Sequence, residues 1–258
     1  MSAATFILVH GAWHDARSWA SVPARLEGLG HRVIAVDLPG RGSPDSASVS
    51  LTDTAAVVED LIAAHPGAIV VGHSLGGVSI AQAAESAADE IGALVYLAAF
   101  APQDGQCAMD IALSAPFAES LVLRHLEVDE HSGMCTVAAD HAAEAFYGTA
   151  DSVIAEAAVA GLLPEGLLLM NSPVHVSEAR FGAVPKHYIE TLFDRAVPIE
   201  CQRSMQVALG GVEVHTLATD HSPFLSAPDH LVETLDTIAH HTSSEPSPRA
   251  SLVTKAMK

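Results

Sequence analysis

One stretch of ten residues, Ala68–Gly77, constrains the fold of this chain more than any other. An apolar, largely β-branched run ends there at Gly72, and Ser74 follows in the pattern Gly-His-Ser-Leu-Gly. Gly-x-Ser-x-Gly is typical of the sharp turn that presents a nucleophilic serine between a buried strand and a helix. Small flanking residues leave room for such a turn. The stretch therefore predicts a nucleophile at Ser74, with an ordinary strand-to-helix turn as the alternative.

Strands and helices alternate on both sides of this turn. Short, mostly apolar segments predict strands at 6–9, 31–36, 68–71 and 92–98, and the strand pattern resumes at 186–190 and 212–217. Apolar residues at helical spacing predict helices at 18–29, 52–64, 78–85, 199–208 and 228–240. Such an alternation, with strands apolar on both faces, predicts an α/β fold whose mostly parallel sheet is covered by helices on both faces. Ligands of such folds bind at the carboxyl ends of the strands.

The middle of the chain interrupts this alternation. Residues 103–185 show no clear strand pattern, and helices are expected at 111–128, 138–146 and 152–163. We therefore expect a mostly helical cap, inserted into a core made of residues 1–102 and 186–241 and not independent of it. Residues 242–258 carry three basic residues and one acidic residue together with Ser and Pro, and this composition predicts a flexible tail.

Composition excludes several classes of function. Twelve basic against 31 acidic residues give a formal net charge of −19, and a surface of this kind repels phosphate backbones and anionic lipids. Neither nucleic acid nor a membrane is therefore an expected partner, and no apolar run approaches the roughly 18 residues that cross a bilayer. The N-terminus shows no export signal, and three scattered cysteines suit neither a disulfide framework nor a metal site. A cytoplasmic protein without a metal is expected, and a homodimer is left open.

Catalysis by Ser74 requires two further side chains. A serine hydroxyl is a weak nucleophile at neutral pH, so it needs a neighbouring base, and the base needs a carboxylate that orients it. After a serine turn of this type, the acid and then the histidine follow in chain order. His221 follows the last predicted strand and Asp194 follows the one before it, so both are expected at the sheet edge that presents Ser74.

Other candidates for these roles fit less well. Glu190 lies within a strand, Asp220 adjoins His221 too closely to orient its ring, and Asp104 follows an earlier strand. Fifteen histidines make chance matches common, and the others, His215 and His241 among them, are expected to be structural or surface residues.

An oxyanion also needs two backbone N–H donors. One is expected from Leu75, directly after the serine, and the other from Ala12 in the loop after the first strand. The side chains expected in a substrate pocket are apolar or aromatic, although core packing would explain most of them equally well: Trp13, Phe100, Leu126, Phe146, Leu163, Met170 and Phe224. Their types predict a small apolar or aromatic substrate.

Four motifs in order make the chain resemble the α/β-hydrolase superfamily: Leu8–His14, Val71–Gly77, Val95–Phe100 and Asp220–Phe224. Within it, the chain is similar to the branch of plant methylesterases, hydroxynitrile lyases and bacterial carboxylesterases, over nearly its whole length to about His241. The resemblance implies an α/β-hydrolase fold with a helical cap and no cofactor. It also implies a triad of Ser74, Asp194 and His221, with an oxyanion hole from Ala12 and Leu75.

Two positions separate this chain from the lyases of that branch. The lyases carry a threonine where this chain has Gly11, and a lysine where it has Ser222. The resemblance therefore favours a serine carboxylesterase that hydrolyses a small apolar or aromatic ester through an acyl-enzyme on Ser74. A hydroxynitrile lyase and a non-catalytic receptor for small ligands are the alternatives.

Overall fold

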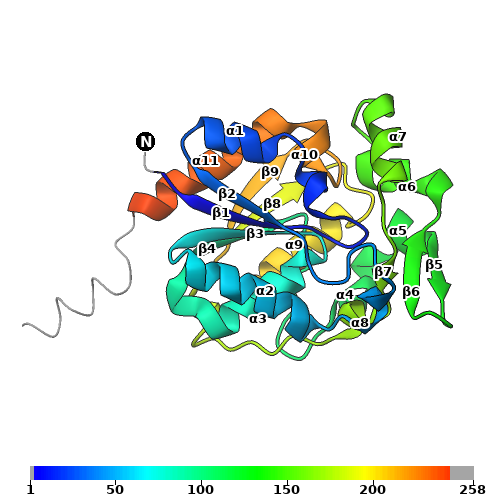
Figure 1. The fold of residues 1–258 in the computed structure, drawn as a ribbon, viewed down its shortest axis with the longest axis horizontal. Helices are drawn as coiled ribbons and strands as arrows, with labels where there is room; N and C mark the ends of the chain where they lie inside the picture. The colour runs from blue at the N-terminus through cyan, green and yellow to red at the C-terminus, as the bar shows by residue number, and fades with distance from the viewer. Residues whose placement is uncertain (1–2, 245–258) are drawn as a thin grey trace, which may run out of the picture.

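A parallel sheet of six strands forms the centre of the computed structural model, which describes residues 3–244 (Figure 1). Its strands lie in the order β2-β1-β3-β4-β8-β9, and every neighbouring pair is parallel. Their bounds are Thr5–Val9 (β1), Arg32–Val36 (β2), Ala68–His73 (β3), Ile91–Leu97 (β4), Lys186–Thr191 (β8) and Glu213–Leu217 (β9). All six predicted strands are present close to their predicted bounds, and the predicted fold class is confirmed.

Helices cover both faces of this sheet (Figure 1). On one face Phe6 and Leu8 of β1 pack in the same apolar cluster as Leu26 and Leu235, which lie in α1 (Val22–Gly28) and α11 (Pro228–Ser244). On the other face, the intervening Ile7 and Val9 join a cluster that includes residues of α2 (Leu51–Ala64), α3 (Gly76–Ala87) and α9 (Ile199–Leu209). Successive residues of a strand point to opposite faces, so the central strands β1, β3 and β4, which are buried on both sides, are almost entirely apolar.

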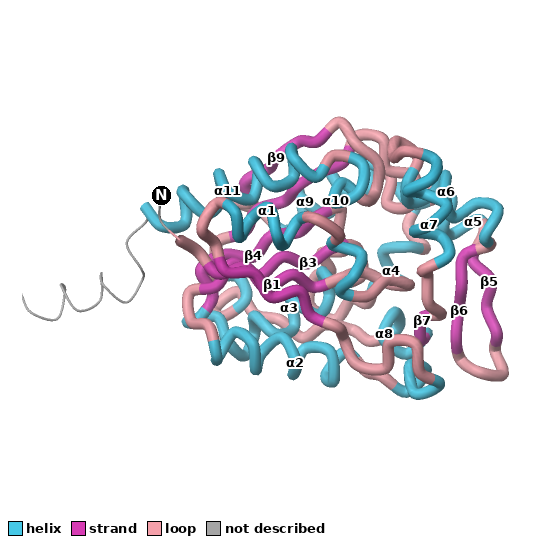
Figure 2. Tube along the Cα trace, turned by 45° about the horizontal axis from the view of Figure 1, so that its top comes forward, coloured by secondary structure: helices cyan, strands magenta, loops and turns pink. Residues whose placement is uncertain are grey.

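The inserted segment forms a cap beside the carboxyl ends of the strands (Figure 2). Its helices are α4 (Ala108–Ala112), α5 (Leu121–Arg124), α6 (Ala139–Tyr147), α7 (Ser152–Ala160) and α8 (Leu167–Asn171). An antiparallel sheet, in the order β5-β6-β7, accompanies them: Leu126–Asp129 (β5), Met134–Val137 (β6) and Glu165–Gly166 (β7). The remaining helical elements are short: Pro223–Ser226 (α10) and 3-10 turns at Ala16–Trp19, Pro44–Ser48, Ala88–Glu90, Ala115–Phe117 and Phe181–Ala183.

Two expectations for the cap are wrong. The predicted helix over 111–128 is broken into short pieces, and the segment that was expected to lack strands contains a hairpin, β5–β6. Leu126 and Val128 alternate with acidic residues, which is the period of a strand. The turn is set by Gly133, whose φ is +70°, and by Asp129, whose carboxylate accepts a hydrogen bond from the His131 N–H (3.0 Å). The helices predicted at 138–146 and 152–163 correspond to α6 and α7.

The expected tail at 242–258 starts inside α11, which continues to Ser244; residues 245–258 lie outside the described residues. Within residues 3–244, no helix combines the length and the apolar character that a bilayer span requires.

Candidate active site

Ser74 sits at the tight turn between β3 and α3. Its φ is +52°, a left-handed backbone conformation that side-chain-bearing residues seldom adopt. Hydrogen bonds hold this conformation, since the Ser74 N–H donates to the Leu97 carbonyl (3.2 Å) and the Ser74 carbonyl accepts from the Phe100 N–H (3.0 Å). A Cβ on Gly76 would lie only 2.6 Å from the His10 carbonyl oxygen. The glycine thus provides room for close packing, while the backbone strain lies on the serine itself.

His221 and Asp194 form a buried pair at the same sheet edge. The His221 Nδ1–H donates to Asp194 Oδ2 (2.8 Å), and both side chains are almost fully buried. The other carboxylate oxygen of Asp194 accepts the N–H groups of Ala196 and Val197, each at 2.8 Å. Gln202 donates to Oδ2 as well (3.1 Å). A carboxylate held by this many donors fixes both the orientation of the imidazole and its tautomer.

The competing carboxylates have other partners. Glu190 accepts hydrogen bonds from Arg203, Gln206 and Thr216. Asp220 accepts the N–H and the hydroxyl of Thr149, and so ties the loop after β9 to the cap. Asp104 is exposed and accepts the Val176 N–H. Of the four carboxylates considered from the sequence, Asp194 is the one that contacts the His221 ring.

His73, next to the serine, links the turn to the loop that carries His221. Its Nε2–H donates to the His221 carbonyl oxygen (3.0 Å), and the two rings lie 4.6 Å apart, centre to centre. Burial holds the pKa of His73 well below its ordinary value. Among the described residues, 3–244, no hydrogen bond joins the Ser74 hydroxyl to the His221 ring. Such contacts are often loose before a substrate binds. No sequence pattern indicates this role of His73.

Two buried histidines fix the peptide groups of the loop that follows β1. The His10 Nδ1–H donates to the Gly11 carbonyl (2.9 Å), and the His14 Nδ1–H donates to the Ala12 carbonyl (2.6 Å). The second ring nitrogen of His14 accepts the Tyr147 hydroxyl of the cap (2.8 Å). Burial is the main cause that lowers the pKa of His10 to about 3 and of His14 to about 4, so both rings are neutral. Because a peptide is planar and trans, fixing a carbonyl also fixes the N–H opposite to it.

Trp13, in the same loop, is held by the cap at three points. Its backbone N–H donates to a carboxylate oxygen of Glu165 (3.3 Å), its carbonyl accepts the Leu163 N–H (2.8 Å), and its indole N–H donates to the Cys135 carbonyl (3.1 Å). Glu165 also pairs with Arg41 in a two-bond ion pair whose side chains are both buried. Isolated acidic and basic residues carry no sequence pattern, so this pair could not have been found from the sequence.

Gly11 leaves no room for a side chain beside the serine. A Cβ at this position would lie 2.7 Å from the Ser74 Cβ and 3.1 Å from His73 Nδ1. A threonine, as the lyases carry here, would collide with the Ser74 side chain. Ser222 is fully buried, so its position also offers no solvated space for a lysine ammonium.

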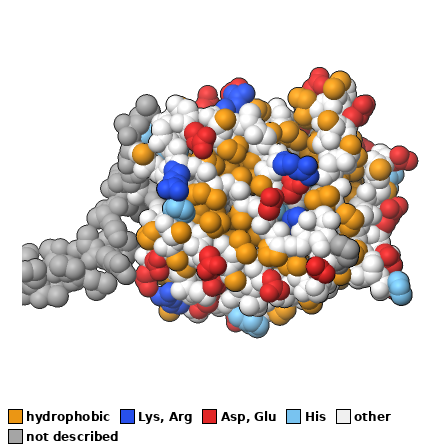
Figure 3. Space-filling model, viewed as in Figure 1, with side chains coloured by type: hydrophobic (Ala, Val, Ile, Leu, Met, Phe, Trp, Pro, Cys, Tyr) orange, Lys and Arg blue, Asp and Glu red, His pale blue; other side chains and the backbone are white. Residues whose placement is uncertain are grey.

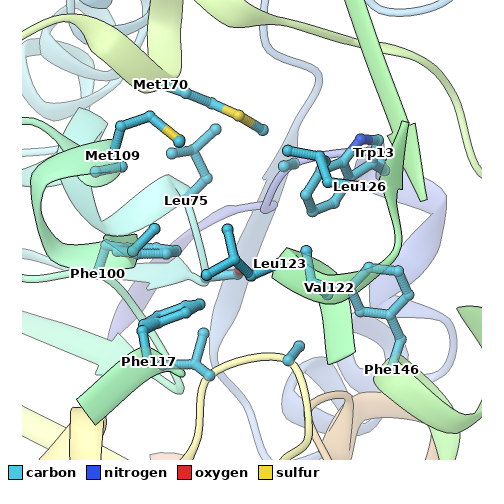
Figure 4. Close-up of a pocket in the computed structure, with 16 residues that line it drawn as sticks. Trp13, Leu75, Phe100, Met109, Phe117, Val122, Leu123, Leu126, Phe146 and Met170 are labelled. Carbon is cyan, nitrogen blue, oxygen red and sulfur yellow. The ribbon is translucent and has the colours of Figure 1, made fainter. Parts of the chain in front are cut away.

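An apolar pocket opens onto Ser74 between core and cap, and Figure 4 shows the side chains that line it pointing inward from both. The hydroxyl of Ser74 is the one hydroxyl among its lining residues, which are otherwise apolar: Ala12, Trp13, Leu75, Phe100, Ala108, Met109, Ala112, Phe117, Val122, Leu123, Leu126, Phe146, Met170, Ala196 and Val197. The pocket thus brings together Ser74, Ala12, Leu75 and five of the seven predicted pocket residues.

Two predicted pocket residues lie elsewhere. Phe224 is buried in the core, with its ring against those of Trp19 (5.4 Å between centres) and His73 (4.9 Å). Leu163 lines a second, more polar surface hollow with Gly42 and Pro164. Sequence reasoning missed four large lining residues of the cap. Met109 precedes the helix predicted at 111–128, whereas Phe117, Val122 and Leu123 lie on separate short elements that the pattern merges into that helix.

Known proteins resemble this chain in sequence and in fold. Residues 6–234 match the model of the alpha/beta hydrolase family. The chain is 31% identical to a pyrethroid hydrolase of Sphingobium wenxiniae, over 91% of this chain and 87% of that protein. It is 28% identical to methylesterase 2 of Arabidopsis thaliana, over 90% and 95%. The crystal structure of a pyrethroid hydrolase from Sphingobium faniae superposes with a TM-score of 0.80, at 28% identity, over 94% of this chain and 98% of that one.

Proposed function

Because the chain belongs to the alpha/beta hydrolase family and its relatives include esterases, we propose that it is a serine carboxylesterase. Its substrates are small apolar or aromatic esters, and Ser74 carries the acyl group between the two half-reactions. One observation carries the proposal: a single hydroxyl, on a strained turn, lies at the base of an otherwise apolar pocket. The buried pair of His221 and Asp194 supports it. These two residues follow the neighbouring strands β9 and β8.

In the first half-reaction His221 takes the proton of the Ser74 hydroxyl as its oxygen attacks the ester carbonyl. Asp194 holds the ring with Nδ1 protonated and stabilises the imidazolium that forms. His221 then gives the proton to the departing alkoxide. In the second half-reaction His221 activates a water molecule, which attacks the acyl group on Ser74 and releases the acid.

The negative charge on the carbonyl oxygen is held by backbone donors. Leu75 immediately precedes α3, so its N–H lies at the positive end of the helix dipole. Ala12 lines the same pocket, and the planar peptide that carries its N–H is fixed through the Gly11 carbonyl by the His10 ring. Donors oriented in advance in a dry site are worth roughly 3 kcal/mol each in the transition state.

The pocket's chemistry indicates the substrate class. Phe100, Phe117, Phe146 and Trp13 offer aromatic surface, and no charged side chain lines the pocket. An ester with an apolar acyl or aryl group would bury its hydrocarbon there, whereas a charged acid would lose its hydration without a partner. The names of the relatives suggest two candidate substrates, a pyrethroid and a methyl ester.

A panel of esters tests the proposal. We expect hydrolysis of p-nitrophenyl esters with short or aromatic acyl groups, and a preference for apolar over charged acyl groups in kcat/KM. Ser74→Ala should lower kcat by about 10⁴-fold or more while circular dichroism stays unchanged. Undiminished turnover by Ser74→Ala, or no turnover of any ester by the wild type, would contradict the proposal.

A further inference from the structure

Two histidines and a glutamate meet at the end of the sheet that lies opposite the pocket. His187 is the second residue of β8, and Glu213 and His215 belong to its neighbour β9. His187 Nδ1 lies 3.3 Å from His215 Nε2. The Glu213 carboxylate oxygens lie 3.6 Å from His187 Nδ1 and 3.7 Å from His215 Nε2. Within residues 3–244, these three side chains are the group whose ligand atoms come close enough to share a metal ion.

Register explains why the three side chains converge. In the parallel pair, His187 is aligned with Glu213, and Ile189 is aligned with His215. Residues two apart along a strand point to the same face, so Glu213, His215 and His187 all project from one side of the sheet. Helix α11 packs near this end of the strands (Figure 1) and places His241 Nδ1 3.6 Å from a Glu213 oxygen.

The spacing of these atoms matches the ligand shell of a tetrahedral ion. Zinc–nitrogen bonds of about 2.0–2.1 Å at the tetrahedral angle place neighbouring ligand atoms roughly 3.4 Å apart. The two ring nitrogens, 3.3 Å apart, are already close to this value. One Glu213 oxygen lies 3.6 Å from His187 Nδ1 and the other lies 3.7 Å from His215 Nε2, and one ligand atom from each of the three residues lies within 4.8 Å of the others. A rotation of the Glu213 carboxylate would bring a single oxygen within ligand distance of both nitrogens. Imidazole nitrogen and carboxylate oxygen are both ligands that zinc accepts.

We propose that His187, Glu213 and His215 bind a divalent transition metal ion, with zinc as the best chemical match. Water completes the coordination, because Glu213 and His215 lie near the surface. The ion stabilises the fold by joining the edge strand β9 to β8. It does not take part in catalysis, because several residues, at about 3.3 Å each, separate it from the strand ends that precede Asp194 and His221. Binding to the folded form alone raises the free energy of unfolding in proportion to ln(1 + [metal]/Kd).

Metal binding by the untagged full chain tests this directly. After treatment with a chelator and its removal, Zn²⁺ is titrated by calorimetry, and Co²⁺ is added to a second sample to record its visible spectrum. We expect one ion per chain, the intense visible bands of a tetrahedral Co²⁺ site, and a higher Tm with Zn²⁺ than with chelator. Glu213→Gln and His215→Gln should each weaken binding about tenfold or more.

The control is His230→Gln, which removes an exposed histidine of α11 outside the cluster and should leave binding unchanged. Circular dichroism and ester hydrolysis show whether each variant is folded. Ester hydrolysis by Ser74→Ala tests only the proposed esterase function and does not test the metal site. Absence of Zn²⁺ binding, or equal binding by the wild type and both cluster variants, would overturn the inference.

Discussion

At the scale of single residues, Gly11 sets the space available to the nucleophile. A side chain there would push against the Ser74 Cβ at 2.7 Å, so even one methyl group must displace Ser74 or the loop that carries Ala12. Displacements of this size cost a large part of the rate, because the reacting groups lose their alignment.

We therefore predict that Gly11→Ala lowers kcat/KM by about 100-fold with a smaller effect on Tm. The matched control is Gly28→Ala, where an added Cβ meets no atom within 4 Å. Steady-state kinetics on a p-nitrophenyl ester compares the two variants. Equal kcat/KM for Gly11→Ala and the wild type would show that the space beside Ser74 does not matter for the reaction.

The role of Asp194 gives a second prediction at this scale. Asp194→Asn removes the charge behind His221 and favours the wrong tautomer, so kcat should fall by about 10⁴-fold. Asp104→Asn alters an exposed carboxylate that follows an earlier strand and should leave kcat unchanged. A loss of activity in Asp104→Asn but not in Asp194→Asn would reverse the assignment.

The sequence could predict these residues because each follows a strand. Parallel strands end at one edge of the sheet, so Ser74, Asp194 and His221 could be brought together from chain order alone. Phe224 could not be excluded in the same way. It lies three residues after His221, but the short helix α10 turns its ring towards Trp19 and the core.

At the scale of elements, the loop after β1 depends on the cap. The buried Arg41–Glu165 pair joins the loop after β2 to β7, and Glu165 also accepts the Trp13 N–H. Removing one partner of a buried ion pair leaves the other charge without compensation, which is more costly than the loss of the pair.

Arg41→Met should therefore lower the free energy of unfolding by about 3–5 kcal/mol. The double variant Arg41→Met with Glu165→Gln should recover part of this loss, because no charge is then left buried. Arg124→Met, in the exposed pair with Glu119, should change it by about 1 kcal/mol or less. Urea denaturation measures all three, and a loss in Arg41→Met no larger than in Arg124→Met would show that the buried pair does not hold the loop.

The cap was the least predictable element. Its helices are four to nine residues long, and over such short spans helical and strand periods are hard to distinguish. The central strands β1, β3 and β4 can be predicted from the sequence because they are buried on both faces and almost entirely apolar. Leu126–Asp129 is short and mostly exposed, so its alternating pattern is not distinguished from the helix predicted at 111–128.

At the scale of the whole molecule, acidic side chains lie scattered over the face drawn in Figure 3, with fewer basic ones among them, in keeping with the net charge of −19. The pH dependence of the free energy of unfolding comes from histidines buried in the core. His10, His14 and His73 are buried, and burial lowers the pKa of each in the folded state. In the unfolded chain their pKa values return to about 6.5.

At pH values between the folded pKa of each ring and about 6.5, unfolding is accompanied by the uptake of one proton by that ring. Their stabilising effect is therefore fully present above pH 6.5 and is lost as the pH falls. We predict a decline of roughly 1.4 kcal/mol per pH unit for each ring between pH 6 and pH 5. Urea denaturation across this range measures it. His14→Gln should reduce the slope of the free energy of unfolding against pH by the contribution of one ring, whereas His131→Gln, at an exposed site, should not change it. A free energy of unfolding that does not vary with pH in the wild type would contradict buried neutral rings.

The proposed mechanism requires a covalent acyl-enzyme on Ser74. Rapid mixing with a p-nitrophenyl ester, quenching in acid within milliseconds, and mass spectrometry of the intact protein and its peptides test it most directly. We predict a mass increase equal to one acyl group, located in the peptide that contains Ser74 and absent from Ser74→Ala. Turnover of the ester with no acylated protein, or with the acyl group on another residue, would contradict the account.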